Sequence, residues 1–374
     1  MNENISSATV TRDHNDSEDV LCLRSLSRYQ LATIAEDTLN KLKAGWYRPS
    51  NGPRISLAED VAFSMENSVV YTEDDIIKKK KLILNIDETS PTSFAIATSS
   101  YPEIEVRHCT TLQAAQSLVA EIAEDRVGIL NFASAKNPGG GFIKGSNAQE
   151  ESLARSSSLY SIFTQTRIFN EFYDYNRRGK RGIYSHRIIY SPRVTIFKDD
   201  NGKLLSSPYH VGIVTVPAPN ASVVRQTELV KSTMMERIRR LLYVFEANKH
   251  DTLVLGAFGC GVFKNNPLDV AIMFRQHLES DEFKNSFKRI IFAVLNEDMY
   301  QIFKEVFTST DLSHIQHETM SIYLDDNNDE QRPYGNQKQQ YKNRTKERRK
   351  RNNDFKQSYD KNYNDFHNYE DENE

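Results

Sequence analysis

From residue 103 onward, short apolar runs alternate with longer segments whose apolar positions recur at helical spacing. The runs are rich in branched aliphatic residues, which is typical of buried strands; they span 103–109, 127–132, 211–220, 253–259 and 289–296. The longer segments predict helices at 111–124, from 149, at 223–247, from 267 and at 298–308. This alternation indicates an α/β fold in which helices cover both faces of a mostly parallel or mixed sheet.

The first hundred residues follow a different pattern. Apolar residues recur at helical intervals between Ser25 and Lys43, and Gly45 ends the pattern, so we predict one helix packed outside the core. The run of lysines at 78–81 is interpreted as a solvated face or linker. We therefore expect a disordered N-terminus at residues 1–20 and an N-terminal helical extension at 21–102. An α/β domain should follow at 103–315, and a disordered charged tail at 325–374.

Composition and charge exclude several classes of protein. The 374 residues carry a net charge of -3, so a polyanionic partner must bind through local groups rather than through overall attraction. Three widely spaced cysteines support neither a disulfide framework nor a CxxC metal site, and they favour a reducing compartment. No apolar run is long enough to span a bilayer, and the polar start resembles no secretory or transit peptide. We expect an intracellular monomer, cytoplasmic or nuclear, that does not contact a membrane.

The loop after the predicted strand at 127–132 carries the residues best suited to ligand binding and catalysis. Its three consecutive glycines, Gly139, Gly140 and Gly141, let backbone N–H groups approach a ligand without interference from Cβ atoms. A predicted helix then begins with two adjacent carboxylates, Glu150 and Glu151, in its first turn. Ligands bind at the carboxyl ends of strands in such sheets, so we expect the site where this loop enters the helix N-terminus.

A second glycine-rich loop, GAFGCGVFKNNP at 256–267, leaves another predicted strand and meets a helix whose first residue is Pro267. Backbone amides and the helix dipole would seat a phosphate or pyrophosphate there. The GxxGxG spacing matches neither the dinucleotide fingerprint nor a P-loop. Phe263 either stacks on a ribose or base or anchors the loop. Cys260 lies where a thiolate would be favoured, but no histidine stands beside it in motif spacing, so we do not expect nucleophilic catalysis.

Several motifs together point to a known family. NFASAKNPGGGFIKGSNAQEE fits the GGG…QEE signature of poly(ADP-ribose) glycohydrolases, and four further stretches agree: LARSSSLY, IIYSPRVTIFKDDNGKLL, VGIVTVPAPN and GAFGCGVFKNNP. The chain resembles the microbial-type branch of that family over residues 26–310. The resemblance implies a macrodomain-like mixed sheet sandwiched between helices, with an ADP-ribose cleft. It also implies hydrolysis of the ribose–ribose O-glycosidic bond without a metal or other cofactor.

Glycoside hydrolysis needs an acid, a base and negative charge near the developing cation, and a carboxyl group can supply all three in turn. Neighbouring helical residues point about 100° apart, so Glu150 and Glu151 cannot be equivalent. The resemblance assigns the acid/base role to Glu151, leaves Glu150 to hold ribose hydroxyls or orient its neighbour, and places Asn137 on the distal ribose. The predicted substrate-binding residues are Asn137, Gly139, Gly140, Gly141, Gln149, Gly259, Cys260, Gly261, Val262 and Phe263.

Some interpretations stay open. Asn137 is alternatively an Asx-turn residue, and Gln149 either binds substrate or satisfies backbone amides. An acid at neutral pH needs a raised pKa, whereas a helix N-terminus stabilises the ionised carboxylate, so burial, the adjacent charge or the substrate must supply the opposite effect. The polar, aromatic and basic stretch 165–182 is either a loop over the cleft or a surface insertion. The basic block 342–351 attracts polyanions, acts as a nuclear address or stays solvated.

The main functional prediction is a poly(ADP-ribose) glycohydrolase that acts on poly(ADP-ribose) or ADP-ribosylated proteins and releases ADP-ribose. One alternative is a hydrolase that removes a single ADP-ribose from protein side chains. The other is a reader that binds ADP-ribose without catalysis. Two adjacent carboxylates argue against a reader, because binding a diphosphate gains nothing from negative charge.

Overall fold

The structure is a computed structural model that describes residues 26–75, 101–179 and 182–310. The predicted disordered segments at 1–20 and 325–374, the lysine run and the basic block of the tail lie outside the described residues.

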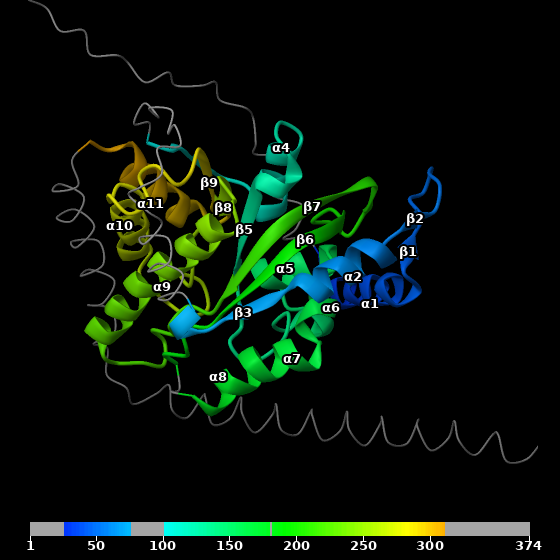
Figure 1. The fold of residues 1–374 in the computed structure, drawn as a ribbon, viewed down its shortest axis with the longest axis horizontal. Helices are drawn as coiled ribbons and strands as arrows, with labels where there is room; N and C mark the ends of the chain where they lie inside the picture. Colours follow the sequence, from blue (N-terminus) through cyan, green and yellow to red (C-terminus); the bar gives the residue numbers. More distant parts are fainter. Residues whose placement is uncertain (1–25, 76–100, 180–181, 311–374) are drawn as a thin grey trace, which may run out of the picture. The chain divides into compact units, whose positions relative to one another are not determined.

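A seven-stranded sheet with the order β3-β6-β7-β5-β8-β9-β4 forms the centre of the fold (Figure 1). The strands from β7 to β4 run parallel to one another, whereas β3 and β6 pair antiparallel with their neighbours. The predicted mixed sheet is therefore confirmed. Its strands are β3 (Val69–Tyr71), β4 (Glu103–Arg107), β5 (Val127–Phe132), β6 (Ile188–Lys198), β7 (Leu204–Val216), β8 (Thr252–Leu255) and β9 (Arg289–Ala293).

Helices pack on both faces of the sheet. One face carries α4 (Thr111–Val119), α5 (Gln149–Ser156) and α6 (Leu159–Phe163), and the other carries α9 (Thr227–Ala247), α10 (Pro267–Leu278) and α11 (Glu297–Thr308). Strand β9 contributes to both faces, because its alternate side chains point in opposite directions. Ile291 joins the apolar cluster under α4, whereas Phe292 packs on Phe274 of α10 and Phe303 of α11.

Strand β6 was not predicted as a strand. Pro192 and Arg193 interrupt its apolar pattern, and a register shift between Ser191 and Val194 places Arg193 at a φ of +50°. Asp199 then closes the hairpin to β7 by accepting hydrogen bonds through Oδ1 from the backbone N–H groups of residues 201 and 203. A β-bulge therefore hid the strand from the period-two pattern.

The predicted N-terminal helix is present as α1 (Arg28–Ala44), with a capping box at Ser27 and a left-handed C-cap at Gly45. The same segment also contains β1 (Trp46–Tyr47), β2 (Ile55–Ser56), α2 (Ala58–Asn67) and β3. Because β3 is the edge strand of the main sheet, the sheet begins before residue 103, and the predicted separation of a helical extension from the α/β domain needs this correction.

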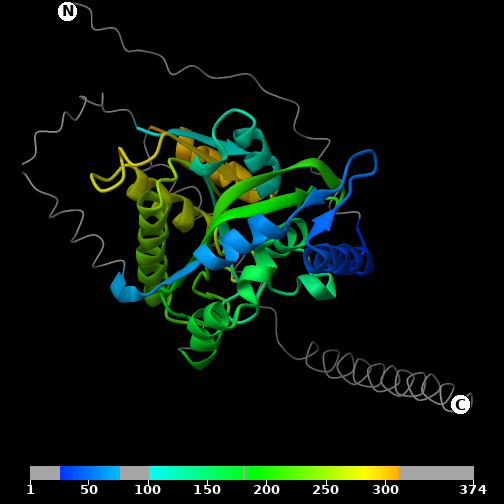
Figure 2. The ribbon, with the colours of Figure 1, turned by 45° about the vertical axis from the view of Figure 1, so that its right-hand side comes forward.

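A buried lysine fastens α1 to the sheet. The Lys198 side chain, at the end of β6, donates to Ile34 O at 3.1 Å and Thr38 Oγ1 at 2.7 Å, and it lies 2.8 Å from Asp37. Burial lowers the pKa of Lys198, while the hydrogen bond and charge of Asp37 oppose that shift. Figure 2 shows α1 as the dark blue helix beside the green helices that follow the glycine loop.

Residues 165–179 are folded rather than laid over a cleft. They contain α7 (Thr166–Ile168), the π-helical turn η4 (Phe169–Asp174) and α8 (Tyr175–Arg178). Ile168, Phe172 and Tyr173 are fully buried in the main apolar cluster. The expectation of a loop over the cleft is therefore wrong for the described part of this stretch.

Candidate active site

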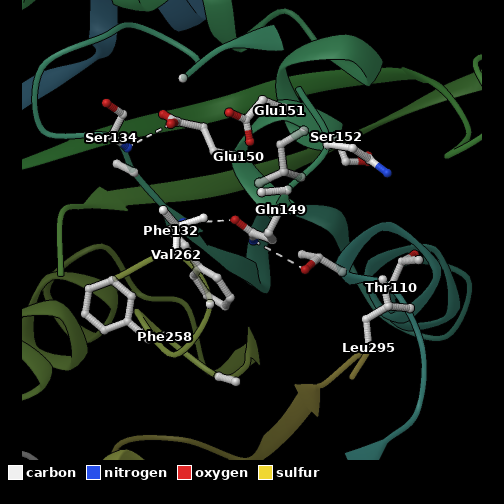
Figure 3. A pocket seen from close by; sticks show the side chains of 18 of the residues that line it. Thr110, Phe132, Ser134, Gln149, Glu150, Glu151, Ser152, Phe258, Val262 and Leu295 are labelled. Atoms are coloured by element: carbon white, nitrogen blue, oxygen red, sulfur yellow. Dashed lines mark hydrogen bonds between the residues drawn. The ribbon is translucent and has the colours of Figure 1, made fainter. Parts of the chain in front are cut away.

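The carboxyl ends of the parallel strands meet at a cavity of about 880 Å³, within the size range of small-molecule sites. Figure 3 shows the two carboxylates at one side of this cavity and Thr110 and Leu295 at another. The predicted convergence of the loops on one rim is therefore observed. Lining residues come from 109–112, 132–153, 257–263 and 293–299, together with Asp200 and Ala218.

Gln149 completes the sheet at the floor of the cavity. Strand β8 pairs with β5 only as far as Ile129. Beyond that point the side chain of Gln149 takes the place of a neighbouring strand: its Oε1 accepts from Phe132 N at 2.9 Å (Figure 3). Its Nε2 donates to Leu130 O at 2.7 Å. Of the two interpretations of Gln149, the structure shows the satisfaction of backbone groups.

Glu150 is the buried member of the carboxylate pair, with 3% of its surface exposed. Its Oε2 accepts from Ser134 N at 2.7 Å, and its Oε1 lies 3.5 Å from Asn131 Nδ2. Burial raises the pKa of Glu150 well above the ordinary value, and the charge of Glu151 adds to the rise, although the hydrogen bonds oppose it. The raised pKa expected of one carboxyl is therefore found on Glu150, the residue that the resemblance does not assign as the acid.

Glu151 is half-buried and lies against the glycines. Its Oε1 accepts from Gly141 N at 2.9 Å. Gly140 has a φ of +60°, and a Cβ there would lie 2.9 Å from Glu151 Cδ and 3.1 Å from Glu150 Oε2. Gly139, with a φ of +63°, does not line the cavity, because it packs on Phe142 instead. Gly140 and Gly141 thus lie against the carboxylates, and of the three glycines only these two line the cavity.

Asn137 lines the cavity and is exposed. Ser134 Oγ shapes the turn by accepting from the backbone N–H groups of Lys136 and Asn137, at 3.4 and 3.1 Å. Within the described part of the chain, the side-chain amide of Asn137 forms no hydrogen bond, so an Asx turn does not occupy it. Both its donor and its acceptor are therefore available to a ligand.

The loop after β8 offers backbone amides to the cavity. Among the described residues, the N–H groups of Gly261, Val262 and Phe263 donate to no protein acceptor, and all three residues line the cavity together with Gly259. A Cβ on Gly261 would meet nothing within 4 Å. Such a run of free amides favours an anion. Phe263 lines the cavity and also packs on Tyr184, with ring centroids 6.0 Å apart.

Two expectations for this loop need correction. The first amides of α10 do not face the cavity, because Asn266 caps the helix and its Oδ1 accepts from Leu268 N and Asp269 N at 2.8 and 3.2 Å. Cys260 is buried and does not line the cavity, and burial raises the pKa of its thiol. A thiolate is therefore disfavoured at Cys260.

Asp200 is a cavity residue that the sequence reasoning missed. It lies in the β6–β7 turn, and its carboxylate accepts from Thr110 Oγ1 at 2.5 Å and Ser152 Oγ at 2.9 Å. Burial raises the pKa of Asp200. Asp200 joins α4, α5 and the hairpin into one wall. The sequence Asp-Asp-Asn-Gly at 199–202 predicts a turn. It does not show which helices the side chains of that turn contact.

Asn131 was also left without a role. It is buried at the end of β5, where Nδ2 donates to Thr215 Oγ1 at 3.3 Å and also faces Glu150. Among the described residues, no group of three or more His, Cys, Asp or Glu side chains is arranged to hold a metal. No described helix is both long and apolar enough to cross a lipid bilayer.

Comparisons with known proteins agree with this site. The family described as "Microbial-type PARG, catalytic domain" matches residues 35–199. Poly(ADP-ribose) glycohydrolase from Thermomonospora curvata, solved with the inhibitor ADP-HPD, is 35% identical, with a TM-score of 0.64; the match covers 74% of this chain and 99% of that chain. No curated protein matches the chain.

The enzyme from Deinococcus radiodurans, solved in complex with ADP-ribose, is 36% identical, with a TM-score of 0.59, and the match covers 67% of this chain and 98% of that one. Identity above a third across nearly the whole of both solved proteins is enough to establish the relationship. The chain therefore belongs to the poly(ADP-ribose) glycohydrolase family, in its microbial-type branch.

Proposed function

We propose that this protein hydrolyses the ribose–ribose O-glycosidic bond of poly(ADP-ribose) and releases ADP-ribose, with Glu151 as the acid/base residue. The observation that carries the proposal is the pair of unlike carboxylates, one buried and one half-buried, at the side of a cavity that also presents free backbone amides. The family relationship and the relatives solved with ADP-ribose or an inhibitor support it.

The groups around the cavity match the parts of ADP-ribose. The free amides of Gly261, Val262 and Phe263 suit the diphosphate. The distal ribose then lies between Asn137 and the two carboxylates, with its hydroxyls donating to Glu150. The remaining part of the cavity, which includes Leu295, takes the adenosine.

Bond cleavage needs a proton on the leaving oxygen. The bond between C1″ of the bound unit and O2′ of the next adenosine breaks, and O2′ keeps the bonding electrons and takes the proton of Glu151. The carboxylate of Glu150 stabilises the positive charge that develops at C1″. Water then adds to C1″ and gives a proton to Glu151, which restores its starting state.

In the free protein, burial and the adjacent charge of Glu151 favour the protonated form of Glu150, because they raise its pKa. Ribose hydroxyls that donate to Glu150 stabilise its ionised form, so substrate binding moves the proton to Glu151, beside the leaving oxygen. Gly141 N holds Glu151 in place through this exchange.

One assay separates the candidate functions. The protein is incubated with purified poly(ADP-ribose), with poly(ADP-ribosyl)ated protein and with mono-ADP-ribosylated protein, and free ADP-ribose is quantified. We expect ADP-ribose from both polymer substrates. Release from the mono-ADP-ribosylated protein alone would replace the proposal by the alternative hydrolase, and no release from any substrate would leave an ADP-ribose reader.

A further inference from the structure

The turn after the three glycines, η3 (Phe142–Lys144), presents an unusual pair of side chains at the rim of the cavity. Ile143 is 49% exposed, Lys144 is exposed as well, and both line the cavity. Because both side chains stand at the mouth of the site, they can meet a part of the substrate that extends beyond the cavity.

The backbone of this rim is fixed. Phe142 is fully buried, and its ring centroid lies 4.8 Å from that of Tyr160, so the next two side chains turn outward. Arg28 of α1 donates through Nε to Lys144 O at 2.8 Å. Gly145, with a φ of +71°, leaves no room for a Cβ, which would collide with Arg28 O. The rim is therefore held in place before any ligand arrives.

No residue with a described position neutralises Lys144. Among the residues with a described position, its ammonium group forms no ion pair and no hydrogen bond, whereas Lys41, Lys198 and Lys231 each pair with an aspartate. A solvated cation at the mouth of a cavity attracts an anion that extends beyond it.

The position of the rim relative to Glu151 identifies its ligand. Gly141, whose N–H donates to Glu151, immediately precedes η3. On the proposed function, the oxygen that Glu151 protonates belongs to the adenosine of the next polymer unit. That adenosine carries an apolar base on one side and a pyrophosphate on the other, and the rim carries an apolar residue and a cation.

We propose that Ile143 and Lys144 form a subsite for the leaving nucleotide, in which the adenine of the next ADP-ribose unit packs on Ile143 and its pyrophosphate pairs with Lys144. This inference rests on the proposed function. The subsite therefore discriminates between leaving groups: a nucleotide gains binding from both the base and the pyrophosphate contact, and a leaving group without a purine or a phosphate does not.

Two substrates with the same bound unit test the subsite. One is purified poly(ADP-ribose), and the other is the 4-nitrophenyl glycoside of ADP-ribose at C1″, whose leaving group carries neither a purine nor a phosphate. An exposed charge pair is worth up to about 1 kcal/mol, so Lys144→Glu should lower kcat/KM on the polymer about fivefold relative to the aryl glycoside. The loss should appear mainly as a higher KM, because the contact exists before and during bond cleavage.

Salt and a second variant separate the two contacts. The Lys144→Glu defect should shrink as ionic strength rises, because salt screens an exposed charge pair. Ile143→Ser should also lower the polymer-to-aryl ratio, but without this salt dependence. Lys43→Glu, at an exposed lysine of α1 that does not line the cavity, changes the charge equally and should leave the ratio unchanged.

The results distinguish two kinds of failure. The subsite would be overturned if Lys144→Glu and Ile143→Ser left the ratio of kcat/KM on the polymer to kcat/KM on the aryl glycoside unchanged. That includes the case in which both substrates lose activity equally. Hydrolysis of the aryl glycoside by a parent protein that leaves the polymer intact would instead overturn the proposed function.

Discussion

The backbone N–H of Gly141 donates to Glu151 Oε1 at 2.9 Å, so the glycine loop holds the side chain to which we assign the chemistry. Neighbouring Gly140 comes close to both carboxylates, as the position of an added Cβ shows. The glycines were expected from the sequence to touch the substrate. That role stays a prediction for Gly140 and Gly141, which line the cavity, and the structure adds that a Cβ would meet the two glutamates at Gly140 and Phe142 at Gly139.

Gly140→Ala should therefore damage catalysis more than binding. The new Cβ displaces Glu151, and the left-handed φ adds strain of about 1–2 kcal/mol. We expect kcat on poly(ADP-ribose) to fall at least about tenfold, since small misplacements of catalytic groups can cost a hundredfold. Steady-state kinetics and ADP-ribose calorimetry measure the two effects. Gly261→Ala is the matched control, because its Cβ meets no protein atom; it should keep the stability of the parent.

Glu151→Gln should abolish most turnover. The amide keeps the size of the side chain and can still accept from Gly141 N, but it has no proton to give to the leaving oxygen. General acid/base catalysis contributes about 10²–10⁴ in rate, so kcat should fall by that factor while ADP-ribose affinity changes little. Turnover near the parent rate would remove Glu151 from the mechanism.

Glu150 should make stability depend on pH. Because its pKa is raised by burial, the folded protein keeps this proton where the unfolded chain, with an ordinary value of 4.5, has lost it. The stabilising contribution is complete below that value and decreases as pH rises toward the folded pKa. Glu150→Gln removes this titration, so its Tm relative to the parent should increase as pH rises above 4.5. A constant difference in Tm would contradict the raised pKa.

Gln149→Ala should destabilise the protein, because it leaves Phe132 N and Leu130 O without partners at the end of β5. Loss of a buried hydrogen-bond partner costs about 1–3 kcal/mol in the free energy of unfolding. Gln149→Glu keeps the acceptor but turns a carboxylate oxygen toward Leu130 O beside two other carboxyl groups, so its cost should be at least as large. Urea denaturation measures both; Gln301→Ala, at an exposed helical position, should change stability by less than about 0.5 kcal/mol.

ADP-ribose should raise the Tm of the protein much more than AMP at equal concentration. The free amides of Gly261, Val262 and Phe263 suit a diphosphate, and only ADP-ribose also reaches Asn137 and the carboxylates. Differential scanning fluorimetry measures the shifts. Equal shifts would show that the cavity does not recognise the diphosphate and distal ribose together.

Local patterns in the sequence predicted much of this molecule. Gly45 at the end of α1, the five strands of branched aliphatic residues and Pro267 at the start of α10 each depend on neighbouring residues, and all are observed. The adjacent glutamates at the start of α5 were identified for the same reason. The roles of the site residues remain predictions that the variants above address.

Contacts between distant segments could not be predicted in this way. Asp200 bonds to Ser152 across 48 residues and to Thr110 across 90, and no periodic pattern records such pairings. Which of the two glutamates is buried depends on how α5 rests on Asn131 and Ser134. Strand β3 was missed because three residues at a sheet edge are too few to show an alternation.

The anchoring of α1 by Lys198 also constrains the order in which the protein matures during synthesis. Thr38 and Lys198 are 160 residues apart, so at usual translation rates the helix emerges on the order of ten seconds before its anchor does. A lone helix of this length is marginal in water. Helix α1 therefore gains this anchor only after β6 has left the ribosome. The support that α1 gives to the rim through Arg28 is secured late in synthesis, although cavity residues 257–263 emerge later still.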